Sequence, residues 1–212
     1  MTVLLGDSWL SRKLKKKAYF LDEKLISKFF KYEKINKNQF IYTKIKNKKF
    51  SKILKKNLFR FITTNIQCKK KFVNLNNYDR DCTFATKKDL NCLKVISKKS
   101  YKFSRFHLDK KITKNTCDKI FTSWIENYFN NQRGDYLLVY RNTGKAVGFL
   151  LLKKDGKKFL RIDLIAVSNQ FKRLNIGKKL IDYAMYLFNK HYSYLTVGYQ
   201  SHNLDAKNFY KK

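Results

Sequence analysis

Proline is absent from this chain of 212 residues, and glycine is scarce, with only seven. Acidic residues are also few, 15 against 49 lysines and arginines, which gives a formal charge of +34. No stretch approaches the roughly 20 apolar residues that a membrane-spanning helix needs, and the first residues show no basic stretch followed by an apolar core. We therefore expect a soluble, cytoplasmic protein.

Metal-ligand spacing is missing as well. The four cysteines, Cys68, Cys82, Cys92 and Cys117, form no C-x-x-C pair and have no histidine cluster beside them, so we expect free thiols and no metal. What the chain does have is 43% hydrophobic and 16% aromatic residues, which supply a core and exclude a largely disordered protein. Its length fits one well-cored domain and a smaller lobe.

The charge leaves two interpretations open. A polyanionic partner, such as nucleic acid, an anionic membrane or a phosphorylated ligand, would explain it. AT-rich codons would also explain it, because they favour Lys, Asn, Ile, Phe and Tyr over Pro and Gly. Lys is spread almost evenly along the chain, so a nucleic-acid surface that combines Lys with aromatics on one face is the weaker interpretation.

The first third of the chain predicts a small α/β lobe. Residues 40–46 (FIYTKIK) alternate as a strand, residues 50–58 fit a helix, and residues 61–67 (FITTNIQ) are typical of a returning strand. A polar segment follows and indicates a boundary. We therefore predict an N-terminal lobe over residues 1–75 and a second domain over residues 80–212.

The second domain predicts a strand, two helices, three strands joined by tight turns, a helix, a strand and a final helix. Asn and Gly in NTGK, and Asp155 with Gly156, supply the turns. The expected elements are a strand at 83–86, a helix from about Lys87, a helix at 115–130, strands at 136–141, 147–153 and 158–167, a helix at 176–188, a strand at 194–199 and a helix from Asn203.

The most informative stretch is the loop QFKRLNIG, between a strand and a helix. Such a loop presents successive backbone N–H groups at a helix amino terminus, which suits a pyrophosphate. Gly177 would let a phosphate approach the backbone closely. Four basic residues add positive charge: Lys172, Arg173, Lys178 and Lys179. Any glycine-containing turn between a strand and a helix shares part of this pattern, so a purely structural role stays open.

The segment VSNQFKRLNIGKKL resembles the Q/R-x-x-G-x-G/A signature of the GNAT acetyltransferases, with Lys172, Asn175 and Gly177 at the three signature positions. The resemblance implies an α/β fold with a mixed, mostly antiparallel sheet flanked by helices, and it implies acetyl-CoA as the cofactor. Asn175 replaces a glycine, but Asn tolerates a left-handed backbone better than most residues. The implied cofactor contacts are Leu164, Ala166, Val167, Lys172, Arg173, Leu174, Asn175, Ile176, Gly177 and Lys178.

Downstream, Asn203, Ala206 and Tyr210 match the pattern N-x-x-A-x-x-x-Y of the same family. The resemblance implies that Asn203 contacts the cofactor and that the Tyr210 hydroxyl lies near the departing sulfur. A phenol in that place can protonate the CoA thiolate as a general acid. A packing role for Tyr210 at the end of the helix is the alternative.

A narrower resemblance points to the nucleotide-linked amino-sugar N-acetyltransferases of surface polysaccharide synthesis, the dTDP-fucosamine acetyltransferase group. It implies acetyl transfer to the amine of a nucleotide-linked deoxy-amino sugar, with Arg105 and His107 as acceptor contacts, since Arg can grip a diphosphate with two donors. Asp163 receives no firm role. The segments that carry the resemblance are GDSWLSRKL, FIYTKIK, LKKNLFRFITTNIQ, KSYKFSRFHLDKKI, WIEN and RIDLIAV.

Other functions stay open: a GNAT enzyme for a protein amino terminus, a polyamine or another small amine, or a basic nucleic-acid-binding protein without activity. A homodimer is left open too. The sequence stops at Lys212, directly after Tyr210, whereas the family continues into one or two closing strands. Either this copy is shortened, or the sheet ends differently here. Missing strands would leave an exposed sheet edge and a fraying last helix.

Overall fold

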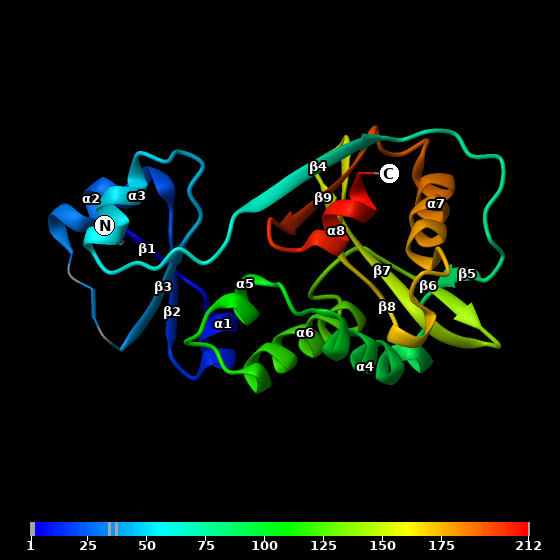
Figure 1. Cartoon of the computed structure of the whole chain (residues 1–212), viewed down its shortest axis with the longest axis horizontal. Helices are drawn as coiled ribbons and strands as arrows, with labels where there is room; N and C mark the ends of the chain where they lie inside the picture. Colours follow the sequence, from blue (N-terminus) through cyan, green and yellow to red (C-terminus); the bar gives the residue numbers. More distant parts are fainter. Residues whose placement is uncertain (1–2, 34, 37, 212) are drawn as a thin grey trace. The chain divides into compact units, whose positions relative to one another are not determined.

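The computed structural model describes residues 3–33, 35–36 and 38–211, so the first two residues and Lys212 lie outside it. The chain divides into two compact units between Ile62 and Thr63 (Figure 1). This division lies before the expected boundary near residue 75, because the strand that was expected to close the first lobe pairs within the second unit. None of the helices in the described residues is long and apolar enough to cross a membrane.

The first unit holds a three-stranded sheet in which β2 pairs antiparallel with β1 and parallel with β3. Asp7 starts the first helix by accepting a hydrogen bond from the Leu10 amide at 2.8 Å. The expected strand at 40–46 and helix at 50–58 are confirmed, each shorter than predicted. Six buried side chains make the core: Val3, Leu4, Leu21, Ile26, Phe29 and Leu54. The elements are β1 (Leu4–Gly6), α1 (Ser8–Leu14), β2 (Lys17–Leu21), η1 (Glu23–Leu25), α2 (Ile26–Tyr32), β3 (Gln39–Thr43) and α3 (Phe50–Lys56).

The second unit is built on a six-stranded sheet of order β4-β9-β8-β7-β6-β5. All neighbouring strands are antiparallel except β8 and β9, which are parallel. This confirms the predicted mixed, mostly antiparallel sheet flanked by helices. The strands are β4 (Asn65–Lys71), β5 (Cys82–Phe84), β6 (Tyr136–Asn142), β7 (Lys145–Asp155), β8 (Phe159–Val167) and β9 (Tyr194–Gln200). The helices are η2 (Lys87–Asp89), α4 (Leu90–Ser100), α5 (Arg105–Leu108), α6 (Lys114–Phe129), η3 (Asn169–Phe171), α7 (Ile176–Phe188) and α8 (Leu204–Tyr210).

Tight turns join the central strands where the sequence predicts them. Thr143 and Gly144 have φ angles of 45° and 78°, so the NTGK turn connects β6 to β7 through two left-handed residues, which match the twist of a hairpin. Gly156, with a φ angle of 75°, turns the chain from β7 into β8. These two hairpins hold three strands in sequence order, and β8 then leads into the loop before α7.

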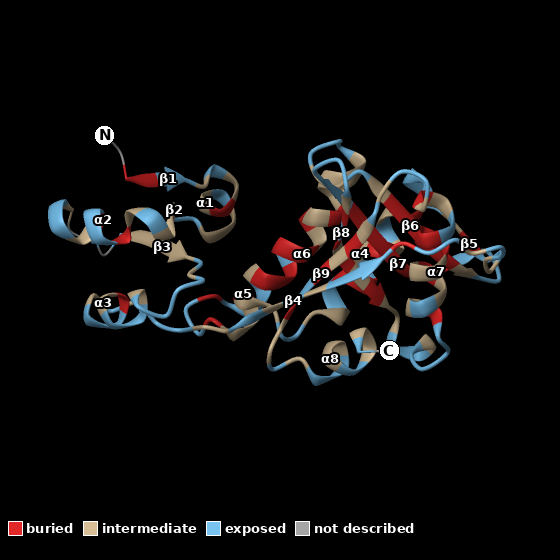
Figure 2. Ribbon diagram, turned by 90° about the horizontal axis from the view of Figure 1, so that it is seen from above, coloured by how far each residue is buried: buried red, intermediate tan, exposed pale blue. Residues whose placement is uncertain are grey.

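Helices cover both faces of the central strands. α4 pairs with α6 and packs on β7 and β8, whereas α7 packs on the other face against β6, β7 and β8 (Figure 1). Residues on both faces of β6 and β7 are therefore buried, as Leu137 and Leu138 illustrate with no exposed surface. β4 differs, because Asn65, Gln67 and Lys69 are exposed and only the residues between them are half-buried (Figure 2). One face of this end of the sheet is open.

Of the two alternatives for the end of the sheet, strand β4 favours the second, because it leaves β9 without an exposed edge. It pairs antiparallel with β9 along its whole length, from Asn65 opposite Gln200 to Lys71 opposite Tyr194. Residues 61–67 were expected to return within the first lobe, but residues 65–71 instead complete the second sheet. The outer edge of β4 carries consecutive lysines, and such charges discourage pairing with another strand.

Candidate active site

Strands β8 and β9 pair only over their first halves and then separate. Their register runs from Phe159 opposite Tyr194 to Ile162 opposite Val197, although β8 continues to Val167. The next residue, Asp163, forms a β-bulge and has no partner in β7. Its two neighbours do have partners: Ile162 lies opposite Leu152, and Leu164 lies opposite Leu151. Beyond Ile162, β8 therefore has a neighbour on its β7 side only, and the opening lies on its other side.

The bulge is held by an ion pair. Nε of Arg133 lies 2.7 Å from Oδ2 of Asp163, and Nη2 of the same arginine donates to Oδ1 at 2.9 Å. The guanidinium also lies 4.0 Å above the ring of Trp124. A two-point contact of this kind fixes the orientation of both side chains. Asp163, for which no firm role could be predicted from sequence, thus fixes the strand at the point where the opening starts.

The main-chain groups of two residues of β8 face the opening. The Ser168 amide donates to the Val147 carbonyl at 2.8 Å, so alternate residues, Ala166 and Leu164, direct their main chain to β7. Ile165 and Val167 direct theirs to the other side, and the Tyr101 hydroxyl donates to the Ile165 carbonyl there at 3.0 Å. Of the three β8 residues expected to bind the cofactor, Val167 faces the opening with its main chain, whereas Leu164 and Ala166 face β7 and are buried.

The loop before α7 leaves its amides without acceptors. Arg173 and Asn175 have left-handed φ angles of 68° and 56°, so Asn175 adopts the conformation that its residue type predicts. No side chain caps α7. Between residues 173 and 178, all within the described part of the chain, no backbone amide donates to a protein acceptor. These donors and the helix dipole form an anion site that fits a pyrophosphate.

The basic residues around this loop divide into two pairs. Lys178 contacts Asp182 at 2.5 Å and Lys179 contacts Asp79 at 2.8 Å, so their charges are largely engaged within the protein. The hydrogen bond that Lys179 donates to Asp79, followed by the one that it donates to Tyr140, raises the pKa of Lys179. Lys172 is exposed and has no acidic partner within the described residues, and Arg173 lies 3.9 Å from an exposed aspartate. Lys172 and Arg173 are therefore the cations available to a ligand at this loop.

Gly177 has a packing role that its signature position does not reveal. A Cβ on Gly177 would lie 3.0 Å from Cζ and 3.1 Å from Cε2 of Phe209, which is tighter than nine in ten real Cβ contacts. Its backbone is helical, so no left-handed conformation demands glycine here. The missing side chain lets α8 approach the first turn of α7. Two other expected cofactor contacts lie in and directly after this loop: the Leu174 side chain is exposed, and the Ile176 side chain is buried.

Helix α8 carries the residues of the second predicted motif. Oδ1 of Asn203 accepts from the Ala206 amide at 3.0 Å, so this side chain caps the helix. Tyr210 stacks on Tyr199, with 5.8 Å between ring centroids, and packs against the core beneath α7. Burial, followed by the nearby Cys68 thiol, raises the pKa of Tyr210, and the phenol is therefore protonated at neutral pH.

Tyr101 is a residue of the opening that the sequence did not single out. Burial raises its pKa, and the Tyr210 phenol is the next largest cause of the rise. Tyr101 follows the last turn of α4, and its ring stacks on Phe121 with 4.4 Å between centroids. In the sequence it is one of 14 tyrosines, and nothing local marks it.

The two predicted acceptor contacts lie on α5. Ser104 caps this helix, and its Oγ lies 2.7 Å from Nδ1 of His107. The His107 ring lies 5.4 Å from Phe121, the same ring on which Tyr101 stacks. Burial, opposed by Asp118, lowers the pKa of His107, which leaves the imidazole neutral at pH 7. Arg105 places its guanidinium 4.6 Å above the Phe106 ring.

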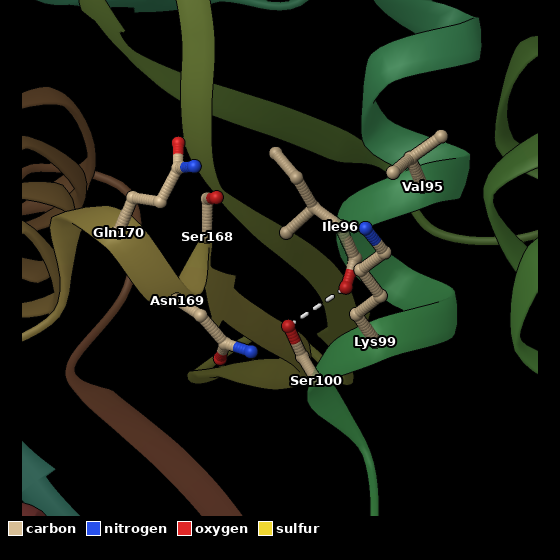
Figure 3. A pocket seen from close by; sticks show the side chains of 7 residues that line it. All are labelled: Val95, Ile96, Lys99, Ser100, Ser168, Asn169 and Gln170. Atoms are coloured by element: carbon tan, nitrogen blue, oxygen red, sulfur yellow. Dashed lines mark hydrogen bonds between the residues drawn. The ribbon is translucent and has the colours of Figure 1, made fainter.

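A separate cavity of about 340 Å³ lies between α4 and the loop that follows β8 (Figure 3). Its walls are Val95, Ile96, Lys99, Ser100, Ser168, Asn169 and Gln170. Ser100 turns its hydroxyl back to the Ile96 carbonyl at 2.7 Å, so only the loop side chains and Lys99 present free polar groups to this space. The cavity borders the loop that leads to the anion site and does not include the amides of residues 173–178.

No curated protein matches the chain. Among solved structures it is similar to Ard1 from Thermoplasma volcanium, with 23% identity over 61% of this chain and 78% of that chain and a TM-score of 0.42. It is also similar to the PaiA N-acetyltransferase from Thermoplasma acidophilum in complex with coenzyme A, with 16% identity over 61% of this chain and 85% of that chain and a TM-score of 0.47. A third similar structure is the ribosomal-protein-S18-alanine N-acetyltransferase from Escherichia coli, with 16% identity over 61% of this chain and 73% of that chain and a TM-score of 0.44.

The family model provides the assignment. The model of the acetyltransferase (GNAT) family matches residues 103–212, slightly more than half of the chain, and it spans α5 to α8 with the strands between them. That range includes strands β8 and β9, the loop before α7 and Tyr210, and Tyr101 lies two residues before it. The chain belongs to the acetyltransferase (GNAT) family and is an acyltransferase that uses acetyl-CoA.

Proposed function

We propose that the protein transfers an acetyl group from acetyl-CoA to the amine of a nucleotide-linked deoxy-amino sugar, a step of surface polysaccharide synthesis of the O-antigen type. The observation that carries the catalytic part is the opening between β8 and β9, with Tyr101 and Tyr210 beside it. The resemblance of the N-terminal and central segments to the amino-sugar acetyltransferases supports the acceptor.

Residues on three elements would hold acetyl-CoA. The main-chain groups of Val167 and the amide of Ile165, whose carbonyl accepts from Tyr101, offer the pantetheine the hydrogen bonds that a neighbouring strand would otherwise make. The free amides from residue 173 to residue 178 suit the pyrophosphate, and Lys172 and Arg173 add charge. Asn203 keeps its amide nitrogen for a contact because only its oxygen is used in capping α8.

The thioester of acetyl-CoA supplies an activated acetyl group. The acceptor nitrogen bonds to the acetyl carbon as the bond from carbon to sulfur breaks, and one proton must leave the nitrogen while one reaches the sulfur. Tyr210 is protonated at neutral pH and is suited to donate that proton. The acceptor amine must be neutral to attack, so water or a base of the protein takes up the proton that leaves the nitrogen.

Two measurements test this proposal. Isothermal titration with acetyl-CoA should give saturable binding, and release of free CoA should then be assayed with nucleotide-linked amino sugars, peptides and polyamines as acceptors. The proposal requires the highest kcat/KM for a nucleotide-linked amino sugar. A peptide or polyamine with a higher kcat/KM would refute the acceptor, and no acetyl-CoA binding would refute the enzymatic role.

A further inference from the structure

The open face of β4, β9 and β8 carries a groove of about 380 Å³ that the cofactor residues do not use. Its walls are Gln67, Cys68, Lys69, Asp155, Phe159, Arg161 and Thr196. The alternation of the strands sends Leu160 and Val197 to the core under α7, and it sends Arg161 and Thr196 to this face. The groove therefore lies on the face of the sheet opposite α7.

The side chains on this face change in character along the strands. Closest to the opening between β8 and β9, the amide groups of Asn65 and Gln67 lie over Gly198, where a Cβ would come within 3.0 and 2.7 Å of their nitrogens. Two residues further from the opening, Lys69 and Arg161 both lie opposite Thr196 in the registers of their strands.

At Tyr194, two residues beyond Thr196 and further from the opening, the rings of Phe159 and Tyr194 stack with 5.5 Å between their centroids. Each of these steps of two residues corresponds to roughly 7 Å along a strand. Amides, cations and aromatic rings thus follow one another from the opening outward.

We propose that this face binds the nucleotide part of the acceptor, with Lys69 and Arg161 against the diphosphate. The inference rests on the proposed function and names the site for its substrate. The amides of Asn65 and Gln67 then meet the sugar hydroxyls, and the aromatic pair meets the base. The order of groups along the strands is the order of sugar, diphosphate and base in a nucleotide sugar, with the amine at the opening.

The charges on this face match a diphosphate better than a neutral acceptor. Nη2 of Arg161 lies 2.7 Å from the Asp155 carboxylate, which orients the guanidinium and neutralises part of its charge. Lys69 lies 4.5 Å above the Tyr194 ring and has no acidic partner among the described residues. His107 contacts Phe121, the ring on which Tyr101 stacks, and Arg105 lies on the same short helix as His107, so both remain candidates for the sugar end.

Titration with dTDP and UDP, in the presence of saturating CoA so that the cofactor site is filled, tests the site directly. Lys69→Ala and Arg161→Gln should each weaken nucleoside diphosphate binding roughly tenfold or more, since charge-assisted hydrogen bonds are lost. In the acetylation assay they should raise the KM for the nucleotide sugar with little change in kcat or in the KM for acetyl-CoA. Lys70→Ala is the matched control, because Lys70 is exposed on the same strand and alternates to the other face.

The outcomes separate this inference from the proposed function. If the protein acetylates nucleotide sugars but Lys69→Ala and Arg161→Gln behave like Lys70→Ala, the site is wrong and the function stands. If the protein binds dTDP or UDP on this face but acetylates only other amines, the proposed acceptor is wrong and the nucleotide-binding groove stands. If neither nucleoside diphosphate binds to the CoA-saturated protein, the inference is overturned. Thermal unfolding of each variant must match the parent protein, and a double substitution of Lys69 and Arg161 should lose binding altogether.

Discussion

Gly177→Ala tests whether the second glycine of the loop signature serves phosphate binding or helix packing. The structure favours packing, because the new Cβ would lie 3.0 Å from the Phe209 ring. Phe209 directly precedes Tyr210 in α8, so a displaced ring moves the proposed general acid. No ligand is needed for this clash, and it should appear in the stability of the free protein.

Two opposing free energies set the size of the effect. Alanine stabilises a helix interior by about 1 kcal/mol relative to glycine. Overfilling a packed contact costs about 1 to 3 kcal/mol, and the Phe209 ring must give way by a few tenths of an ångström to admit the Cβ. The net loss is then up to about 2 kcal/mol, which lowers Tm by up to about 8 °C for a protein of this size.

Phe209→Leu provides the control, because leucine lacks the two ring atoms that the Cβ would meet. In that background Gly177→Ala should raise Tm by about 2 to 4 °C, since only the helix propensity remains. Scanning calorimetry of the four proteins gives the coupling between the two sites. If Gly177→Ala instead weakens acetyl-CoA binding equally in both backgrounds, with no coupling in Tm, the glycine serves phosphate approach and the packing argument is refuted.

Three further results are expected. Tyr210→Phe should lower kcat by about a hundredfold or more while calorimetry shows unchanged acetyl-CoA affinity, since general acids typically contribute about 10² to 10⁴; a loss below threefold would make Tyr210 a packing residue. Lys172→Ala should weaken acetyl-CoA binding and flatten its salt dependence, whereas Lys178→Ala, whose charge is paired, should change both less; equal effects would contradict the division of charges. Tyr101 and Tyr210 have pKa values raised above the ordinary 10.0. Below pH 10 both phenols are therefore neutral in the folded and in the unfolded chain. Above pH 10 the two tyrosines lose their protons first in the unfolded chain, so the free energy of unfolding falls. Urea unfolding at pH 8, 10 and 11 should therefore show full stability up to about pH 10 and then a loss of at most about 1.4 kcal/mol per tyrosine and pH unit, and replacement of both by Phe should reduce that loss.

Local sequence determined much of the second unit. The turns at Gly144 and Gly156 and the helix at residues 176–188 lie where residue type and periodicity predict them, because φ preference and amphipathic spacing act within a few residues. The left-handed Asn175 belongs to the same class, since a short polar side chain lowers the cost of that conformation. The position of the loop that presents free amides could thus be predicted.

Tertiary structure decided what no local pattern contains. Residues 61–67 were expected to complete the first lobe, yet residues 65–71 pair with β9, because a strand's periodicity shows which side chains share a face and not which strand lies beside it. The early separation of β8 from β9 and the approach of Tyr101 to Ile165 depend on contacts between residues more than 30 positions apart.

The same distinction applies to Gly177. The sequence determined that a glycine stands at the start of a helix, and only the position of α8 places the Phe209 ring where its side chain would be.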